Sequence, residues 1–462
     1  MTLNKKILAA AIVGGLFAAN AQAQVDISVP SPTPVTFASE LIVPGAGLSL
    51  TNAANALDLR TALRYSFSSG EVRYARIECP GVSFNAGSAV TASSAASLGA
   101  INGLGTNAIT FSITATDPST TATSTVTVSG NRTISGTTAA TCSYSLYDQP
   151  SQAQAGGTTG RIATVSGSYL AFATSYTLTG TAVGAVANVE ASPSFSRFVS
   201  AAPTNSTATA SIGNVVFALR SPAPLIANGT AVTLATLLGA TSNHTIAGDF
   251  SAAANSDGTY TGAALARVFF AANADCTGGA TNATALTATS ARFTTGNAAV
   301  TGTLCYSPRT GVAIPVSTYA QTFNAVSADA TTYNVGSLGP VALGSITRNG
   351  TQLQAPFVQV PAGWTSRIVL TNTGSVARPY TVTAQTETGV TSTLGAGASG
   401  SIPANGTIVL NTSDIATFTG ATRGTLNVTV AGPNNDIQGL YQIVNGATGS
   451  IANTALVRPG TN

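Results

Sequence analysis

The side chains that carry out most acid–base and nucleophilic chemistry are scarce in this sequence. Its 462 residues include one histidine, His244, and no serine elbow or cysteine stands near it. His244 lies in an Asn- and Thr-rich stretch, where a lone histidine is interpreted as a solvated turn residue and not as a catalytic base. The sequence therefore predicts no catalytic residue, and we expect a protein that is not an enzyme.

Four cysteines are the next candidates for a site. They have neither the Cys-x-x-Cys spacing nor the histidine partners of a zinc site, so we expect structural disulfides and no metal centre. Four cysteines allow three pairings. Each neighbouring pair falls inside one strand-rich stretch, which favours nearest-neighbour pairing. The expected pairs are Cys79 with Cys142 and Cys276 with Cys305.

Three other patterns resemble binding sites. Residues 395–400 match GxGxxG, but Ser-Ile-Pro follows at 401–403 where a dinucleotide site needs a helix, so we expect a hairpin loop. Residues 434–436 (Asn-Asn-Asp) offer oxygen ligands for calcium, although an Asx-type turn is the simpler interpretation. Trp364 is interpreted as a core residue before a strand and not as an exposed sugar-stacking aromatic. We therefore expect no cofactor.

The balance of charge also excludes a class of partner. Charged residues make up 7% of the chain, against about 25% of an ordinary soluble domain. Of the 18 basic residues only Lys5 and Lys6 are lysines, and both precede all 15 acidic residues. Arginines and acidic residues then nearly balance, which leaves no basic patch for a duplex, so we expect no nucleic-acid partner.

The start of the chain has the pattern of a secretory signal peptide over residues 1–23. Lys5 and Lys6 form a positive region, an apolar stretch follows at 7–17, and 21–23 (Ala-Gln-Ala) provide a small-x-small cleavage site. No later apolar run reaches the roughly 18 residues of a membrane helix. We expect an exported, extracellular protein that lies at the cell surface and has no helical membrane anchor.

Elsewhere, period-two alternation of apolar and polar residues indicates strands. One predicted strand presents Leu57, Leu59, Leu63, Tyr65 and Phe67 on its apolar side. A turn at 68–71 leads into 72–79, which predicts a hairpin. The pattern recurs at 109–114, 209–219 and 263–270. These signals predict an all-β protein.

The final third has the clearest pattern, with alternating strands expected at 366–373, 380–385, 407–411, 425–430 and 437–444. This spacing favours an immunoglobulin-like sandwich with Ile368 and Leu370 facing inward. Breaks in periodicity at 149–160 and 328–339 divide the chain. We expect two or three tandem β-sandwich domains after the cleaved signal peptide: an N-terminal β domain at 24–155, a middle one at 156–327 and the C-terminal sandwich at 328–462.

The absence of lysine beyond Lys6 bears on association. Sheet edges are commonly protected by charge, lysine above all, because unpaired backbone groups otherwise pair with another chain. We therefore expect self-association into homo-oligomers. Four arginines on the predicted hairpin, Arg60, Arg64, Arg73 and Arg76, are candidates for contacts between subunits. Residues 24–34 are expected to form an extended arm that adds to a neighbour's sheet.

The composition and the end of the chain resemble a known class of protein. Segments 355–361 (APFVQVP), 367–374 (RIVLTNTG) and 440–445 (LYQIVN), within an almost uncharged β-rich chain, resemble the surface-layer and surface-array proteins of Gram-negative bacteria. The resemblance implies an exported subunit that assembles on the outer membrane, with lipopolysaccharide as a partner at one end and calcium as a frequent aid. The 15 acidic residues and the lack of Gly/Asp nonapeptide repeats do not support calcium here.

Together these observations predict an exported structural protein that self-assembles into a surface array. The alternative is a monomeric adhesin or carbohydrate-binding surface protein, for which the single tryptophan offers little aromatic platform. A third possibility, an exported hydrolase, requires two carboxylates to meet in space.

Overall fold

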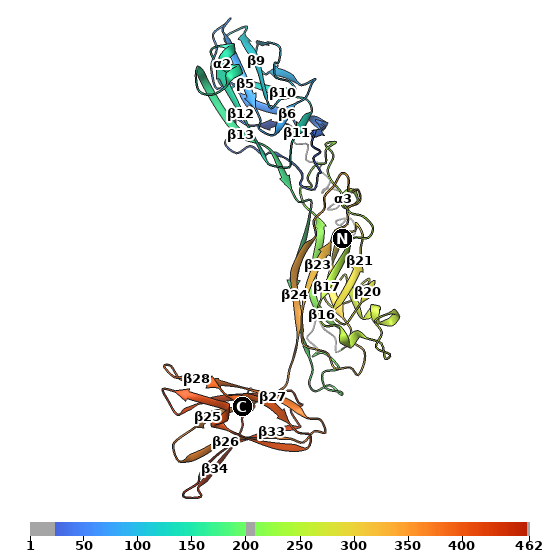
Figure 1. The fold of residues 1–462 in the computed structure, drawn as a ribbon, viewed down its shortest axis with the longest axis vertical. Helices are drawn as coiled ribbons and strands as arrows, with labels where there is room; N and C mark the ends of the chain where they lie inside the picture. Colours follow the sequence, from blue (N-terminus) through green and yellow to red (C-terminus); the bar gives the residue numbers. More distant parts are fainter. Residues whose placement is uncertain (1–23, 200–207, 460–462) are drawn as a thin grey trace, which may run out of the picture.

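The computed structural model describes residues 24–199 and 208–459, and strands are by far its commonest secondary structure. The signal peptide expected at 1–23 lies outside the described residues. Buried apolar side chains form three clusters, which we call the first, second and third cores. Figure 1 shows them along an elongated molecule, with the third core at the end that holds the C-terminal strands. The all-β prediction is confirmed.

The first core lies between two sheets and a smaller third one, because alternate residues of each strand face inward. The six-stranded sheet has the order β2 (Val35–Ala38), β13 (Arg161–Ala173), β12 (Ala140–Tyr147), β5 (Val72–Glu78), β9 (Ala108–Ala115) and β8 (Ala96–Leu98). The four-stranded sheet has the order β1 (Val25–Asp26), β4 (Leu59–Ala62), β10 (Thr125–Ser129) and β7 (Ala89–Ala92). The small sheet consists of β3 (Leu48–Leu50), β11 (Arg132–Ile134) and β6 (Val82–Phe84).

The second core lies between a five-stranded and a six-stranded sheet. The five-stranded sheet has the order β14 (Tyr176–Ala182), β16 (Ala210–Leu219), β22 (Val300–Tyr306), β18 (Val268–Ala271) and β19 (Thr281–Asn282). The six-stranded sheet has the order β15 (Gly184–Ala187), β24 (Leu338–Arg348), β23 (Ser317–Asn324), β17 (Asn243–Ala247), β21 (Ser290–Thr294) and β20 (Ala285–Leu286).

The third core fills a sandwich of two four-stranded sheets. We call one the β32 sheet: β25 (Thr351–Gln359), β32 (Arg423–Val430), β27 (Arg378–Gln385) and β29 (Ser399–Ile402). We call the other the β26 sheet: β30 (Gly406–Asn411), β26 (Trp364–Asn372), β33 (Ile437–Asn445) and β34 (Ile451–Ala455). A two-stranded sheet of β28 (Thr391–Leu394) and β31 (Ala416–Thr419) adjoins them. The five strands expected here are confirmed, and Ile368 and Leu370 are fully buried.

Two local predictions about the first core are wrong. The strand that contains Leu59 and the one that follows at 72–78 do not form a hairpin, because β4 pairs with β1 and β10 while β5 pairs with β12 and β9. The chain instead crosses from one sheet to the other. The arm at 24–34 does not extend outward either: Val25 pairs with Leu59 of its own sheet, and Ile27 is fully buried.

Strand pairing also crosses both expected domain boundaries. The boundary at 155/156 falls between β12 and β13, which are antiparallel neighbours. The boundary at 327/328 falls between β23 and β24, which are also neighbours. The six-stranded sheet of the first core and that of the second core therefore each include residues from both sides of an expected boundary. No helix within the described ranges, 24–199 and 208–459, is long and apolar enough to cross a lipid bilayer.

Candidate assembly surfaces

All four cysteines form disulfides: Cys79–Cys142 lies in the first core, and Cys276–Cys305 joins a loop to β22 beside the second. Cys79 follows β5 and Cys142 lies on its neighbour β12, so the register of the sheet brings the two thiols together. Cys79, Cys142 and Cys305 are fully buried. These cysteines are therefore structural, and none is left as a nucleophile or a metal ligand.

His244 is not the solvated turn residue that the sequence suggested. It lies on β17 and is fully buried between Phe217 and Phe323 of the first core and Phe270 of the second. Gln321 Nε2 donates to His244 Nδ1 at 2.6 Å. Burial lowers the pKa of His244 to about 4. The ring is thus a neutral packing element at the junction of two cores, and it has no access to a substrate.

The hairpin expected at the GxGxxG pattern is wrong, because β28 before it pairs with β31 while β29 after it pairs with β27. Residues 396–398 make one short 3₁₀ turn that leads into β29, and no long helix follows. A side chain at Gly395 would lie within 2.4 Å of the Asp414 carbonyl oxygen, so packing explains this glycine. Trp364 is not a core residue: it begins β26 at the rim of the sandwich and is 37% exposed.

The possible calcium ligands at 434–436 have partners within the chain. Arg458 donates to the side-chain oxygen of Asn434 at 2.8 Å, and the Asn434 N–H donates to Glu190. The Asp436 N–H donates to the Pro433 carbonyl, which closes a turn. No group of three or more His, Cys, Asp or Glu residues suited to a metal occurs in the described part of the chain.

The four arginines expected at subunit contacts form contacts within the chain. Arg60 pairs with Asp26 at 3.6 Å, and Arg76 pairs with Glu78 at 2.9 Å. Arg64 donates to the Ser28 carbonyl. Arg73 pairs with Glu71, whose pKa is lowered by the Ser68 N–H, the Tyr65 hydroxyl and Arg73 itself. The arginines also lie on different sheets and do not form one patch.

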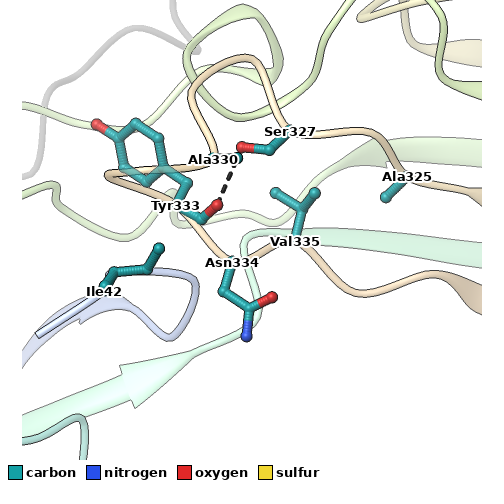
Figure 2. A pocket seen from close by; sticks show the side chains of 7 residues that line it. All are labelled: Ile42, Ala325, Ser327, Ala330, Tyr333, Asn334 and Val335. Carbon is teal, nitrogen blue, oxygen red and sulfur yellow. Dashed lines mark hydrogen bonds between the residues drawn. The ribbon is translucent and has the colours of Figure 1, made fainter.

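Two of the hollows on the described part of the surface are well defined, and neither is lined by the residues of an active site. One lies where loop 325–335 meets the first core, and Figure 2 shows its lining: Ile42, Ala325, Ser327, Ala330, Tyr333, Asn334 and Val335. The Ser327 hydroxyl donates to the Tyr333 carbonyl there at 3.0 Å. The other is lined by Ala355, Pro356, Phe357, Gln359, Tyr441, Ile443, Thr454, Ala455 and Leu456. Both lack a carboxylate or imidazole to transfer protons.

The strands at the ends of the sheets are nearly free of charge. Among the edge strands of the described sheets, only β1 contains an Asp, Glu, Lys, Arg or His residue, and that residue is Asp26. The long edges β14, β25, β30 and β34 consist of Thr, Gln, Asn, Gly, Pro, one Tyr and apolar residues. Their side chains lack the charge that opposes strand addition. On β25, Gln354 already pairs with Val457, which covers part of that edge. These edges and the outward sheet faces are the candidate assembly surfaces.

Comparison with curated proteins and with solved structures gives no match that identifies the chain. No curated protein matches the chain. Among solved structures, the chain is similar to the C-terminal domain of the AgI/II polypeptide BspA from Streptococcus agalactiae, at 8% identity over 70% of this chain and 99% of that one, with a TM-score of 0.17. A mutant of that domain gives 8% identity over 67% and 94%, with a TM-score of 0.19. At these scores the likeness carries no argument.

The match to a protein family covers most of the chain. The family model of the S-layer protein Slr4 matches residues 62–447, which include strands of all three cores. The match agrees with the resemblance found in the sequence and with the all-β fold. The chain belongs to the S-layer protein Slr4 family.

Proposed function

We propose that this chain is the exported, non-catalytic building block of an array that its copies form on the surface of a Gram-negative cell. Family membership over residues 62–447 is the observation that carries the proposal. It makes the chain a surface-layer structural protein. Self-assembly, export by the signal peptide at 1–23 and the Gram-negative host are the finer parts of the proposal.

The surface supports self-assembly on physical grounds. Edge strands that lack charge present free N–H and C=O groups to any neighbour. A formal charge of +3 over 462 residues adds little long-range repulsion between copies. Copies of the chain therefore meet few electrostatic barriers to lateral contact.

The partners on the cell follow from the resemblance alone. We include lipopolysaccharide of the outer membrane as the partner at one end of the subunit. Calcium is left out, because the Asn434 side chain and the backbone around it have partners within the chain. The domain division at 24–155, 156–327 and 328–462 stays a proposal for the folding units, although sheets continue across both boundaries.

Negative-stain electron microscopy of the purified mature protein tests this function. At rising protein concentration we expect regular sheets or tubes, both with and without the chelator EDTA. Dispersed particles at high concentration would contradict the array and favour the adhesin alternative. Arrays that dissolve in EDTA and return with calcium would contradict assembly without calcium.

A further inference from the structure

The third core has two outward faces of opposite character. Residues directly opposite each other on antiparallel strands share a face, so the register shows which side chains lie together. The two central rows on the outward face of the β32 sheet are polar: Gln352, Thr429 and Thr381 form one row, and Gln354, Asn427 and Thr383 form the next. This face is well suited to water.

The outward face of the β26 sheet has an apolar row across all four of its strands. Val409, Val369, Leu440 and Ala455 lie opposite one another in that order on β30, β26, β33 and β34. Val409 is 55% exposed, and none of the four belongs to the third core or packs against it. We call them the apolar row. Val444 and Ile451 lie opposite each other nearer the β33–β34 turn and form a separate apolar pair on the same face, beyond the row that contains Gln442; Ile451 is 58% exposed.

Polar rows flank the apolar row and hold its strands in place. Arg367 donates to Gln442 Oε1 at 2.5 Å, and Gln442 Nε2 donates to Asn453 Oδ1 at 2.7 Å. This ladder crosses three adjacent strands on one side of the apolar row. On the other side Thr371 lies opposite Thr407 and Gln438. Arg367 is the single charged residue on the four strands.

No other part of the described chain covers this face. Contacts between the second and third cores run through the ends of the β32 sheet and the turn before β33, where Arg378 donates to Ser194 and Asn434 to Glu190. In Figure 1 strands β26, β33 and β34 lie on the side of the third core away from β24. The apolar row therefore points out of the molecule.

The size of the face fits a contact that is weak alone and strong when repeated. Four strands about 4.8 Å apart and seven residues of about 3.3 Å each give a face on the order of 400 Å². A stable, specific complex buries about 800 Å² on each partner. One such contact is thus too small for a tight dimer, whereas a lattice repeats it at every subunit. Because the chain belongs to an S-layer family, copies of itself are the partners present at high density.

We propose that the outward face of the β26 sheet is a contact between two copies of this chain, with the apolar row of one packed on the apolar row of the other. This inference rests on the proposed array, and the contact would be one of the interfaces between its subunits. A two-fold axis along the row places Val369 near its own copy. The same rotation sets the Arg367 ladder of one copy against Thr371 and Gln438 of the other, which keeps the two guanidinium groups apart.

Chemical cross-linking at high protein concentration can capture a weak contact, so it tests this one without requiring a regular array. The chain has no free cysteine, so Val369→Cys introduces a single reactive thiol. Packed sheets lie about 10 Å apart, which is too far for a disulfide and within reach of a short bis-maleimide. We expect a cross-linked dimer for Val369→Cys and not for Thr383→Cys, its counterpart on the polar face. Equal cross-linking of both variants, or of neither, would overturn the contact.

Charge placed on the row gives a second test. Val409→Lys sets two ammonium groups against each other across the axis, so we expect self-association in sedimentation to weaken by at least about tenfold. Thr383→Lys adds the same charge to the polar face and should associate as the wild type does. An unchanged melting temperature shows that each variant is folded. A folded Val409→Lys variant that associates like the wild type would overturn the contact.

The two tests separate this contact from the proposed function. Arrays that persist in Val409→Lys refute the contact and leave the array in place. If the wild type forms no array but the Val369→Cys variant cross-links, the contact is supported and the array is refuted. Absence of both arrays and cross-links refutes both.

Discussion

The first and third cores are built from the same kinds of strands but differ in how they use charge and apolar surface. Four of the five ion pairs in the described chain lie in the first core, together with a disulfide. Of the exposed large apolar side chains among the described residues, half lie on the strands and loops around the third core: Phe357, Trp364, Val376, Leu394, Val409 and Ile451. The first core thus satisfies its groups internally, while the third leaves apolar surface for another molecule.

Arg132 illustrates the internal bonding of the first core. Its guanidinium is fully buried and donates to the Val128 carbonyl at 2.8 Å, the Gly130 carbonyl at 2.7 Å and the Tyr169 hydroxyl at 3.1 Å. It also lies over the Phe84 ring. A buried cation is tolerated here because its donors have partners. Arg367 in the third core instead has its hydrogen bonds on an outward face.

Removal of the first disulfide should have the largest effect on this contrast. The bond joins residues 63 apart in sequence, so Cys79→Ala/Cys142→Ala should lower the free energy of unfolding of the first core by about 2–5 kcal/mol. Hydrogen exchange followed by mass spectrometry can measure the change peptide by peptide. The third core, which has no disulfide, should exchange as before. Equal loss of protection in both cores would show that they unfold as one unit.

Replacement of Arg132 should have the next largest effect. Arg132→Met keeps a long buried side chain but leaves the Val128 and Gly130 carbonyls without their donor. The free energy of unfolding of the first core should then fall by about 3 kcal/mol. Thermal unfolding measures this loss. If the melting temperature is unchanged, the buried guanidinium adds nothing to the stability of the first core, and the contrast drawn above is wrong.

Acid should act at the junction between the first and second cores through His244. Because burial holds its pKa at about 4, below the ordinary value of 6.5, the folded state binds the proton less well than the unfolded state. Neutral His244 therefore adds its full contribution to the free energy of unfolding above pH 6.5. This contribution falls by on the order of 2–3 kcal/mol as the pH drops toward 4. Melting curves between pH 7 and pH 4 measure the loss.

A double variant supplies the control for this titration. His244→Leu/Gln321→Leu removes both hydrogen-bonding partners and leaves an apolar junction. Its stability should change less between pH 7 and pH 4 than that of the wild type. The same pH dependence in both proteins would assign the effect to the carboxylates instead of His244.

The smallest effect is expected from the exposed ion pair of the third core. Arg423 donates to Glu387 at 2.9 Å, and both side chains are at least half exposed. Such pairs add little stability in water, so Arg423→Gln should leave the melting temperature unchanged. The pKa of Glu387, which Arg423 lowers, should return toward its ordinary range in a carboxylate titration. A clear drop in melting temperature would show that the third core also depends on charge pairs.

The sequence predicts the strands of this protein better than their partners. Alternation is a local property, so Ile368 and Leu370 are correctly placed facing the core of the third sandwich. Pairing depends on the whole fold: the turn at 68–71 suggests a hairpin, yet it connects two different sheets. His244 was misassigned because its polar neighbours on β17 face the other side of the strand. The apolar row has no signal in any single strand, since it exists only when the register aligns four of them.

We expect copies of this chain to assemble through the outward face of the β26 sheet. A structure of the assembled protein by electron cryomicroscopy would show whether they do. We predict two third cores face to face, with Val369 and Leu440 of one copy packed against the same residues of the other. An array in which this face is open to solvent, while contacts run through the first core or the strand edges, would contradict the claim.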